Sequence, residues 1–363
     1  MEISEMNTES TRGVNKTITS TKIDIRKLSL LELESNLLEK GEKKFRAKQI
    51  YEWLWQKSAQ NFDVMSNLSL KTREILKENF VINAISTYKV QISADRTIKS
   101  AFKLHDKHLI EGVLIPTSSR MTACVSSQVG CSLTCKFCAT GYMKRERNLD
   151  AAEIYDQVVS IAQQAEQNYQ IPLSNIVFMG MGEPLLNYNN VMEAIQKITS
   201  TEGLGMASKR ITVSTAGIAK MIKKLADDDV KFNLAVSLHA ANDEKRNQIM
   251  PINESNSLEA LTEALLYFYE KTKNRITFEY IVFYNFNDTQ KDAEELYRFA
   301  KKMPCNINII EYNPISDADF VNTDADTLEK FANYLESRGL NVNVRRSRGK
   351  DIDAACGQLA VKK

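Results

Sequence analysis

Long apolar runs are missing from this sequence of 363 residues. None approaches the roughly 20 residues that a membrane-spanning helix needs, so we expect no membrane partner. The first 22 residues are rich in Ser, Thr, Asn and charge and have no apolar centre, so we expect a disordered tail rather than a secretory signal.

The sequence also lacks an excess of charges of one sign, because its formal net charge is only +2. Nucleic acid as a partner must therefore be argued from local clusters of basic residues.

A second Cys-x2-Cys pair, which zinc ribbons usually have, is also absent. The chain has six cysteines: four lie within fifteen positions, from Cys124 to Cys138, and Cys305 and Cys356 stand apart. In a long chain without a signal segment, this crowding favours metal binding or catalysis over structural disulfides. We therefore expect a protein of the reducing cytoplasm.

The hydrophobic pattern changes twice along the chain. Residues 23–80 have apolar side chains at helical spacing and predict a helical accessory module. Residues 81–118 alternate in polarity and predict a β-hairpin extension, with two or three antiparallel strands near 88–92, 100–104 and 109–115. Residues 119–363 alternate between strand-like and helix-like segments, which predicts a parallel sheet with right-handed crossovers.

Six strand–helix units follow one another in this last region. Strands are expected at 122–126, 175–179, 210–214, 233–238, 275–282 and 306–312, with a late one at 341–346. Helices are expected at 150–169, 189–201, 218–226, 258–273, 289–302 and 324–338, and Asp150 and Glu153 have capping-box spacing at the first of them. The predicted fold is α/β, a partial (β/α)6 barrel whose site lies at the carboxyl ends of its strands.

The loop after the first of these strands contains Cys131, Cys135 and Cys138 in a C-x3-C-x2-C array. Three thiolates can hold a cube of four irons and leave one iron open to a reactive molecule. The alternative is a zinc knuckle with a distant fourth ligand: Cys124, Cys305, Cys356 or His239. The spacing, with Phe137 before the last cysteine, resembles the radical S-adenosylmethionine (SAM) superfamily, in which the array binds a [4Fe–4S] cluster and the open iron chelates SAM.

Polar residues at later strand ends would surround the same cofactor. An apolar strand runs into the turn Gly180-Met-Gly-Glu183, and the resemblance implies that Gly182 and Glu183 hold the SAM amino group. The other candidates for cofactor binding are Ser214, Ser237, Leu238, His239 and Asn313. Strand-end capping is the alternative for each one alone, and His239 could equally be a structural histidine.

Two further cysteines suggest covalent catalysis. Cys124 lies seven residues before the array, and Cys356 lies near the C-terminus in Asp-Ala-Ala-Cys-Gly-Gln. One thiolate of such a pair can carry a group while the other releases it by forming a disulfide. Two unrelated cysteines are the alternative.

Several longer motifs resemble the RlmN adenine carbon-2 methyltransferases, from about residue 25 to the C-terminus. They are CVSSQVGC-x3-C-x-FCATG, GMGEPLLN, SLH, MPIN and DIDAACGQL, with FRAKQIYEW in the helical module. Cfr-type carbon-8 methyltransferases share the cysteines, but their glycine-rich turn ends in Glu-Ala, so Pro184 favours carbon-2. One departure is Ala-Asp-Arg-Thr at 94–97, where the family usually has Asp-Gly-Thr.

The resemblance implies methylation of one adenosine in the peptidyl transferase centre of 23S rRNA and of adenosine 37 in certain tRNAs. One SAM would methylate Cys356, and a second would give the radical that activates this methyl group for addition to the ring. Cys124 would then release the product through a transient disulfide with Cys356. Glu111 matches a proton acceptor, and whether Glu111 or Cys124 removes the ring proton stays open.

The resemblance also implies RNA contacts and an electron donor. Basic residues with aromatic neighbours are expected to bind RNA: Lys43, Lys44, Arg46, Lys48, Arg345, Arg346 and Arg348. For each basic run a solvated face is the alternative. For the protein as a whole, the alternative to an enzyme is an RNA-binding module whose metal is only structural. The expected partners are 23S rRNA, tRNA and a low-potential donor, either flavodoxin or ferredoxin, and the enzyme is expected to be a monomer.

Overall fold

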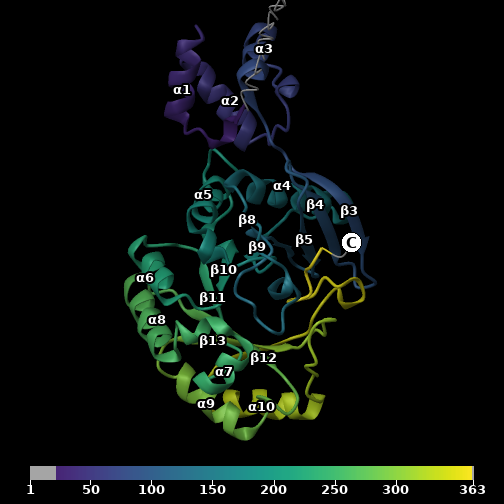
Figure 1. Cartoon of the computed structure of the whole chain (residues 1–363), viewed down its shortest axis with the longest axis vertical. Helices are drawn as coiled ribbons and strands as arrows, with labels where there is room; N and C mark the ends of the chain where they lie inside the picture. The colour runs from purple at the N-terminus through teal and green to yellow at the C-terminus, as the bar shows by residue number, and fades with distance from the viewer. Residues whose placement is uncertain (1–21, 362–363) are drawn as a thin grey trace, which may run out of the picture.

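The computed structural model describes residues 22–361, so the tail predicted for residues 1–22 lies outside them except for Lys22. The molecule is elongated, with the N-terminal helices at one end and a sheet wrapped by helices below them (Figure 1). No helix among the described residues is both long and apolar enough to cross a membrane.

A ten-stranded sheet forms the body of the molecule, in the order β14-β13-β12-β11-β10-β9-β6-β5-β4-β3. Its parallel part is β6 (Met121–Cys124), β9 (Asn175–Phe178), β10 (Ile211–Thr215), β11 (Asn233–Ser237), β12 (Ile276–Val282), β13 (Cys305–Glu311) and β14 (Asn341–Arg345). Its antiparallel part is β3 (Ser86–Ile92), β4 (Ile98–Lys103) and β5 (Leu109–Pro116). The three predicted strands of the extension thus continue the barrel sheet, since β5 pairs with β6.

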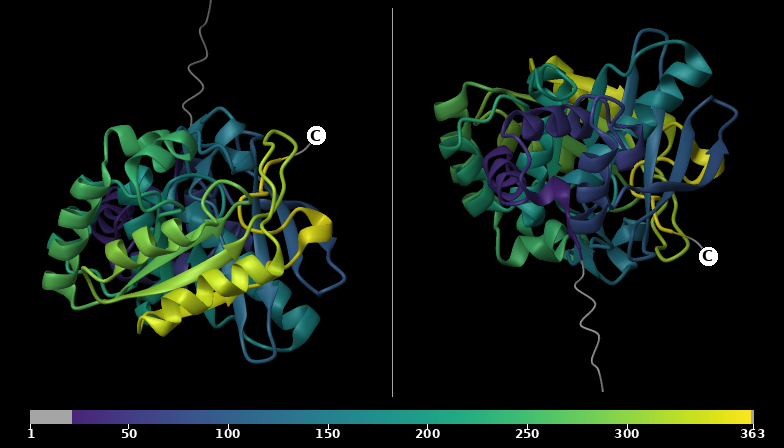
Figure 2. Two further views of the ribbon diagram at one scale, coloured as in Figure 1. Left: turned by 90° about the horizontal axis from the view of Figure 1, so that it is seen from below. Right: turned by 90° about the horizontal axis from the view of Figure 1, so that it is seen from above.

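Six long helices follow the parallel strands and cover the outside of the curved sheet (Figure 2). They are α4 (Ala151–Tyr169), α5 (Tyr188–Thr199), α6 (Ala219–Asp227), α8 (Leu258–Thr272), α9 (Gln290–Ala300) and α10 (Ala325–Ser337). The predicted capping box of Asp150 and Glu153 is present at the start of α4. The helices and strands match the predicted partial barrel, which confirms the fold class.

One short helix and two pairs of short strands were not predicted. Helix α7 (Asp243–Ile249) lies between β11 and α8, and its sequence is too polar and too short to show a helical stripe. Two-residue strands form the pairs β1 (Ile23–Asp24) with β2 (Phe80–Val81) and β7 (Gln128–Val129) with β8 (Arg147–Asn148). Pairs this short carry no periodicity in the sequence.

The N-terminal module consists of α1 (Leu30–Glu39), α2 (Phe45–Trp55) and α3 (Leu70–Asn79). It packs on the barrel through a buried ionic cluster, in which the Arg26 guanidinium binds both Asp156 oxygens of α4 at 2.8 and 2.9 Å. Asp24 also contacts Arg26, and the rings of Trp55 and Tyr155 meet edge to face at 5.1 Å. These contacts fix the module against α4.

The turn at 94–97, where the sequence departs from the family pattern, joins β3 to β4. Arg96 has a φ of 72°, in the left-handed region that glycine adopts without strain. Glycine is the residue at this position in the Asp-Gly-Thr pattern. Its guanidinium lies over the Tyr169 ring at 4.6 Å, and Asp95 accepts a bond from the Thr97 amide. The hairpin therefore forms with Arg96 in the position of the glycine.

Candidate active site

One cavity collects most of the predicted site residues. The elements around it are the cysteine loop after β6, the turn after β9, the ends of β10 and β11, and the C-terminal loop. The predicted residues that line it are Cys131, Cys135, Cys138, Gly182, Glu183, Ser214, Ser237, His239 and Cys356. Because these residues follow the ends of parallel strands, the cavity lies where the barrel pattern predicted a site.

The three loop cysteines share this cavity and influence one another. Burial, and then the charges of Cys138 and Cys131, raise the pKa of Cys135 well above its usual value. Burial raises the pKa of Cys131 to about 11. Thiols this buried become thiolates when a metal takes the place of the proton, so the donor set suits a metal group.

The arrangement of the thiols bears on which metal group fits. Among the described residues, no three His, Cys, Asp or Glu side chains converge as ligands of a single ion do. An iron–sulfur cube does not require such convergence, because each thiolate binds a different iron. The loop is also anchored, since the Lys136 amide donates to Ile249 and the Ala139 amide to Gly357. A preformed loop with three thiols in one cavity fits a [4Fe–4S] cluster with one open iron.

The turn after β9 needs glycine at Gly182. Its φ is +95°, and an added Cβ would lie 2.5 Å from the Cβ of Gln128. This close approach places Glu183 in the cavity, where its carboxylate accepts from the amides of Leu185 at 3.0 Å and Ala216 at 2.8 Å. Burial raises the pKa of Glu183 to about 6, so the group is still ionised at neutral pH. An ionised carboxylate with a free lone pair can accept from an ammonium group.

The other strand-end residues divide into two groups. Ser214, Ser237 and His239 line the cavity, and His239 Nδ1 accepts from the Ile281 amide at 3.1 Å. Burial lowers the pKa of His239 to about 3, so the ring is neutral and the proton lies on Nε2. Leu238 and Asn313 do not line the cavity: Leu238 is in the core, and Asn313 donates to the Cys356 carbonyl at 3.1 Å.

The C-terminal loop carries Cys356 into the cavity and is held on several sides. Asp351 accepts from the Ser93 hydroxyl at 2.5 Å and the Ala94 amide at 3.0 Å. Downstream, the Thr140 hydroxyl donates to the Leu359 carbonyl at 2.6 Å. Part of residue Cys356 is exposed, but its thiol is withdrawn from water, and this burial raises its pKa. Cys356 therefore faces the same space as the three loop cysteines.

Cys124 ends β6 and is buried next to this space, without lining it. Burial raises its pKa to about 12, and the charge of Cys356 adds to this shift. All six cysteines are free thiols, so the structure contains no disulfide between Cys124 and Cys356. The transient disulfide stays a prediction.

Glu111 on β5 lies beneath the C-terminal loop. Its carboxylate is 3.6 Å from the Lys99 ammonium, and the Lys99 ammonium in turn donates to the Asp353 carbonyl. Burial raises the pKa of Glu111, and its Oε2 has no hydrogen-bond partner. A buried carboxylate with a free oxygen has the properties of a proton acceptor.

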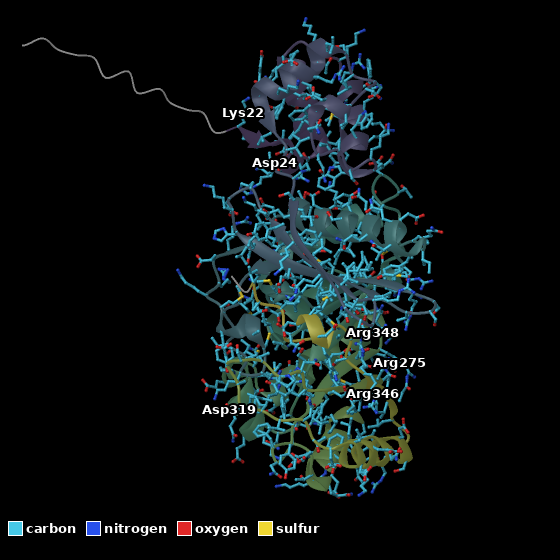
Figure 3. All side chains as sticks on the ribbon, turned by 90° about the vertical axis from the view of Figure 1, so that its right-hand side faces the viewer. Lys22, Asp24, Arg275, Asp319, Arg346 and Arg348 are labelled. Carbon is cyan, nitrogen blue, oxygen red and sulfur yellow. The ribbon has the colours of Figure 1, made fainter. Side chains whose placement is uncertain are left out.

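The predicted basic residues form two separate groups. Lys43, Lys44 and Lys48 are exposed on the N-terminal module. Arg346 and Arg348 lie on the barrel half, away from the N-terminal module at the top (Figure 3). The C-terminal arginines already pair with carboxylates: Arg345 with Glu279, Arg346 with Glu311 and Arg348 with Asp95.

Two buried charged residues of the site were missed from the sequence. Glu279 lines the cavity, and its signal was a lone carboxylate within the apolar strand 276–282. Arg246 is completely buried, and its guanidinium donates to the carbonyls of Ala216 at 2.6 Å and Leu238 at 3.1 Å. It thereby ties the ends of β10 and β11 together beside the cysteine loop.

Known proteins share both parts of this architecture. The Radical SAM superfamily matches residues 125–300, and the ribosomal RNA large subunit methyltransferase N-terminal domain matches residues 23–82. A solved radical SAM methyltransferase from Sphaerobacter thermophilus is 38% identical, with a TM-score of 0.89 over 94% of this chain and 100% of its own. The fold, the three cysteines and these matches define a radical SAM enzyme, a class that uses a [4Fe–4S] cluster and SAM.

Curated relatives narrow the class. A protein of Cytophaga hutchinsonii is 64% identical over 95% of both chains, and one of Christiangramia forsetii is 60% identical over 94% of this chain and 97% of its own. Both are described as dual-specificity RNA methyltransferases RlmN. The chain belongs to the RlmN family of radical SAM RNA methyltransferases.

Proposed function

We propose that this enzyme methylates carbon-2 of adenine, at one adenosine in the peptidyl transferase centre of 23S rRNA and at adenosine 37 of certain tRNAs. Two SAM molecules are consumed per methyl group, and Cys356 carries the methyl as S-methylcysteine. The dual specificity named for the relatives supports two kinds of RNA substrate. The observation that carries the proposal is the presence of Cys356 in the same cavity as Cys131, Cys135 and Cys138.

The cluster and SAM, when bound, supply a radical that abstracts hydrogen from a methyl group. Cys131, Cys135 and Cys138 would hold the cluster, and Glu183, next to Gly182, would accept from the SAM ammonium. Ser214, Ser237 and His239 line the space for the rest of the cofactor. Leu238 and Asn313 do not line this space. Asn313 positions the Cys356 loop through its hydrogen bond to the Cys356 carbonyl, and Leu238 packs in the core.

Cys356 brings the methyl group to the base, because an electron-poor ring carbon cannot attack SAM itself. Cys124 lies close enough to influence the Cys356 thiol and is the resolving thiol that frees the product. Glu111 accepts the ring proton, supported by its free and buried Oε2 beneath the Cys356 loop. Each residue thus has one role in transferring the methyl group.

The target adenine must leave its stack to reach Cys356, because the cavity lies inside the barrel end. The basic residues of the N-terminal module and those before Cys356 would hold the RNA backbone on either side. The Arg346 side chain is exposed, so phosphate can replace its Glu311 partner, because exposed ion pairs are weak. Arg348 is half-buried against Asp95 and is held more firmly. The electron donor is a low-potential protein of the flavodoxin or ferredoxin type, and the enzyme acts as a monomer.

Mass spectrometry of digested RNA tests the regiochemistry. RNA treated with reconstituted enzyme, SAM and reductant is compared with 2-methyladenosine and 8-methyladenosine standards. The proposal expects 2-methyladenosine, and RNA from cells lacking the protein should have lost it. 8-Methyladenosine as the product would show instead the Cfr-type activity, which the shared cysteines also permit.

A further inference from the structure

Glu279 is a carboxylate in the middle of β12 that faces the reaction space. It is 5% exposed and lines the same cavity as Cys356. Its Oε1 accepts from the Asn308 amide at 2.8 Å, and its Oε2 has no hydrogen-bond partner. The Arg345 guanidinium stands 3.7 Å from Oε2, too far for a hydrogen bond but close enough to favour the charged form.

The negative charge of Glu279 affects the pKa of Cys356. Glu279 raises the pKa of Cys356, so the two side chains lie within interaction range in one cavity. Burial also raises the pKa of Glu279, so its carboxylate is a stronger base than an exposed one. Arg345 opposes both shifts, so it limits the effect of burial on each group.

Methylation of Cys356 requires a proton acceptor that the proposed function leaves unassigned. A thiol attacks a sulfonium methyl as its thiolate, and the surroundings of Cys356 disfavour the thiolate. The proposed function already gives Glu111 the ring proton and Glu183 the SAM ammonium. His239 accepts from the Ile281 amide through its Nδ1, so its ring has no free acceptor. Glu279 belongs to the cavity lining, and its Oε2 accepts no hydrogen bond, although the Arg345 guanidinium lies 3.7 Å away.

We infer that Glu279 is the general base that takes the proton of Cys356 when this thiol accepts a methyl group from SAM, a step that rests on the proposed function. The Cys356 S–H bond breaks and the proton goes to Oε2 of Glu279, directly or through one water. The S–CH3 bond forms as the methyl–sulfonium bond of SAM breaks, and S-adenosylhomocysteine leaves. The step involves no net oxidation or reduction. Glu279 then loses its proton to solvent before the next cycle.

Two other roles for Glu279 make different predictions. If its charge only repels the thiolate, removing that charge would make Cys356 more reactive toward every electrophile. If it only binds SAM, its loss would slow methylation and leave the thiol's reactivity toward other reagents undiminished. A general base alone slows both reactions when it is removed.

The test uses full-length protein whose cluster has been reconstituted and whose Cys356 peptide is shown by mass to be unmethylated. SAM with a trideuterated methyl is added without RNA or reductant, and the labelled Cys356 peptide is followed with time. The expected result is labelling about 100-fold slower in Glu279→Gln than in wild type, within the range for loss of a general base. Glutamine keeps the acceptor for Asn308, and a melting curve confirms that the variant is folded.

The matched control is Glu263→Gln on the outer helix α8, which should label at the wild-type rate. In a second measurement, cluster-free protein without SAM reacts with iodoacetamide, and alkylation of the Cys356 peptide should be slower in Glu279→Gln. Wild-type or faster labelling in Glu279→Gln would overturn the inference, as would slow labelling with undiminished alkylation. No label on Cys356 of the wild type would instead refute the proposed function.

Discussion

Cys305 and Cys356 show how position decides the chemistry of a thiol. Cys305 begins β13 at the opposite end from the cavity, where it is buried and its thiol donates to the Ala300 carbonyl at 3.4 Å. Cys356 lies in a loop and lines the cavity together with the three loop cysteines. Their residue type is the same, so the sequence alone could separate them only through the motif around Cys356.

Glu183 gives a prediction on pH at the scale of one residue. Burial raises its pKa to about 6, so it is ionised at neutral pH and becomes protonated as the pH falls through that value. A protonated Glu183 cannot pair with the SAM ammonium, so SAM affinity should fall as the pH drops through about 6. The expected loss is about 1.5–3 kcal/mol, the range for a hydrogen bond to a charged group.

Equilibrium dialysis with cluster-loaded protein measures this affinity. Glu183→Gln should bind SAM weakly at neutral pH and show no further fall near pH 6. Glu202→Gln, on an exposed loop, is the matched control and should follow the wild-type curve. An unchanged SAM affinity in Glu183→Gln would refute the role of Glu183.

At the scale of elements, the turn after β9 has the strictest local requirement of the site. Gly182→Ala would place a Cβ 2.5 Å from the Cβ of Gln128 at a φ of +95°. Left-handed strain and overpacking together should cost about 2–4 kcal/mol of unfolding free energy. Denaturant unfolding of the cluster-free protein measures this cost.

Gly205→Ala is the control for that substitution, because its φ is +66° but nothing lies within 4 Å of the added Cβ. It carries the strain without the clash and should cost about 1 kcal/mol. Equal costs for the two variants would show that the close approach to Gln128 does not matter.

The elements also show what the sequence could predict and what it could not. The outer helices α4 to α10, apart from α7, were predictable because each places one apolar stripe on the sheet. Glu279 and Arg246 were missed as site residues because the role of each depends on contacts with residues that are distant in the sequence. The hydrogen bond from Asn308 to Glu279, for example, joins residues 29 positions apart on neighbouring strands. Hydrophobic patterns in the sequence predict which residues are buried, but they do not predict the hydrogen-bond partners of buried polar atoms.

At the scale of the whole molecule, a buried ionic cluster and the Trp55–Tyr155 ring contact hold the N-terminal module against α4. Asp156 is bound by both Arg26 and the Ile85 amide, and its exposed fraction is 7%. Asp156→Ala would remove one of the two carboxylates that bind the buried Arg26 guanidinium and leave only Asp24. We expect a loss of about 3–5 kcal/mol of unfolding free energy, the range for breaking a buried ion pair.

Unfolding in guanidinium chloride measures this loss, with Glu294→Ala as the control. That substitution removes an exposed ion pair with Arg298 and should change the free energy of unfolding by less than about 1 kcal/mol. If the ionic cluster orients the module for RNA, Asp156→Ala should also weaken RNA binding while Cys356 still accepts a methyl group from SAM. A stability equal to that of Glu294→Ala would show that the cluster does not hold the module.

The central claim is that the methyl group passes through Cys356 and is released by Cys124. Reconstituted enzyme is incubated with SAM, reductant and RNA, and both the RNA and the Cys356 peptide are analysed by mass spectrometry. Cys356→Ala should form no methyladenosine, Cys305→Ala should turn over like the wild type, and Cys124→Ala should accumulate RNA covalently bound to the Cys356 peptide. Full turnover by Cys356→Ala would contradict the account.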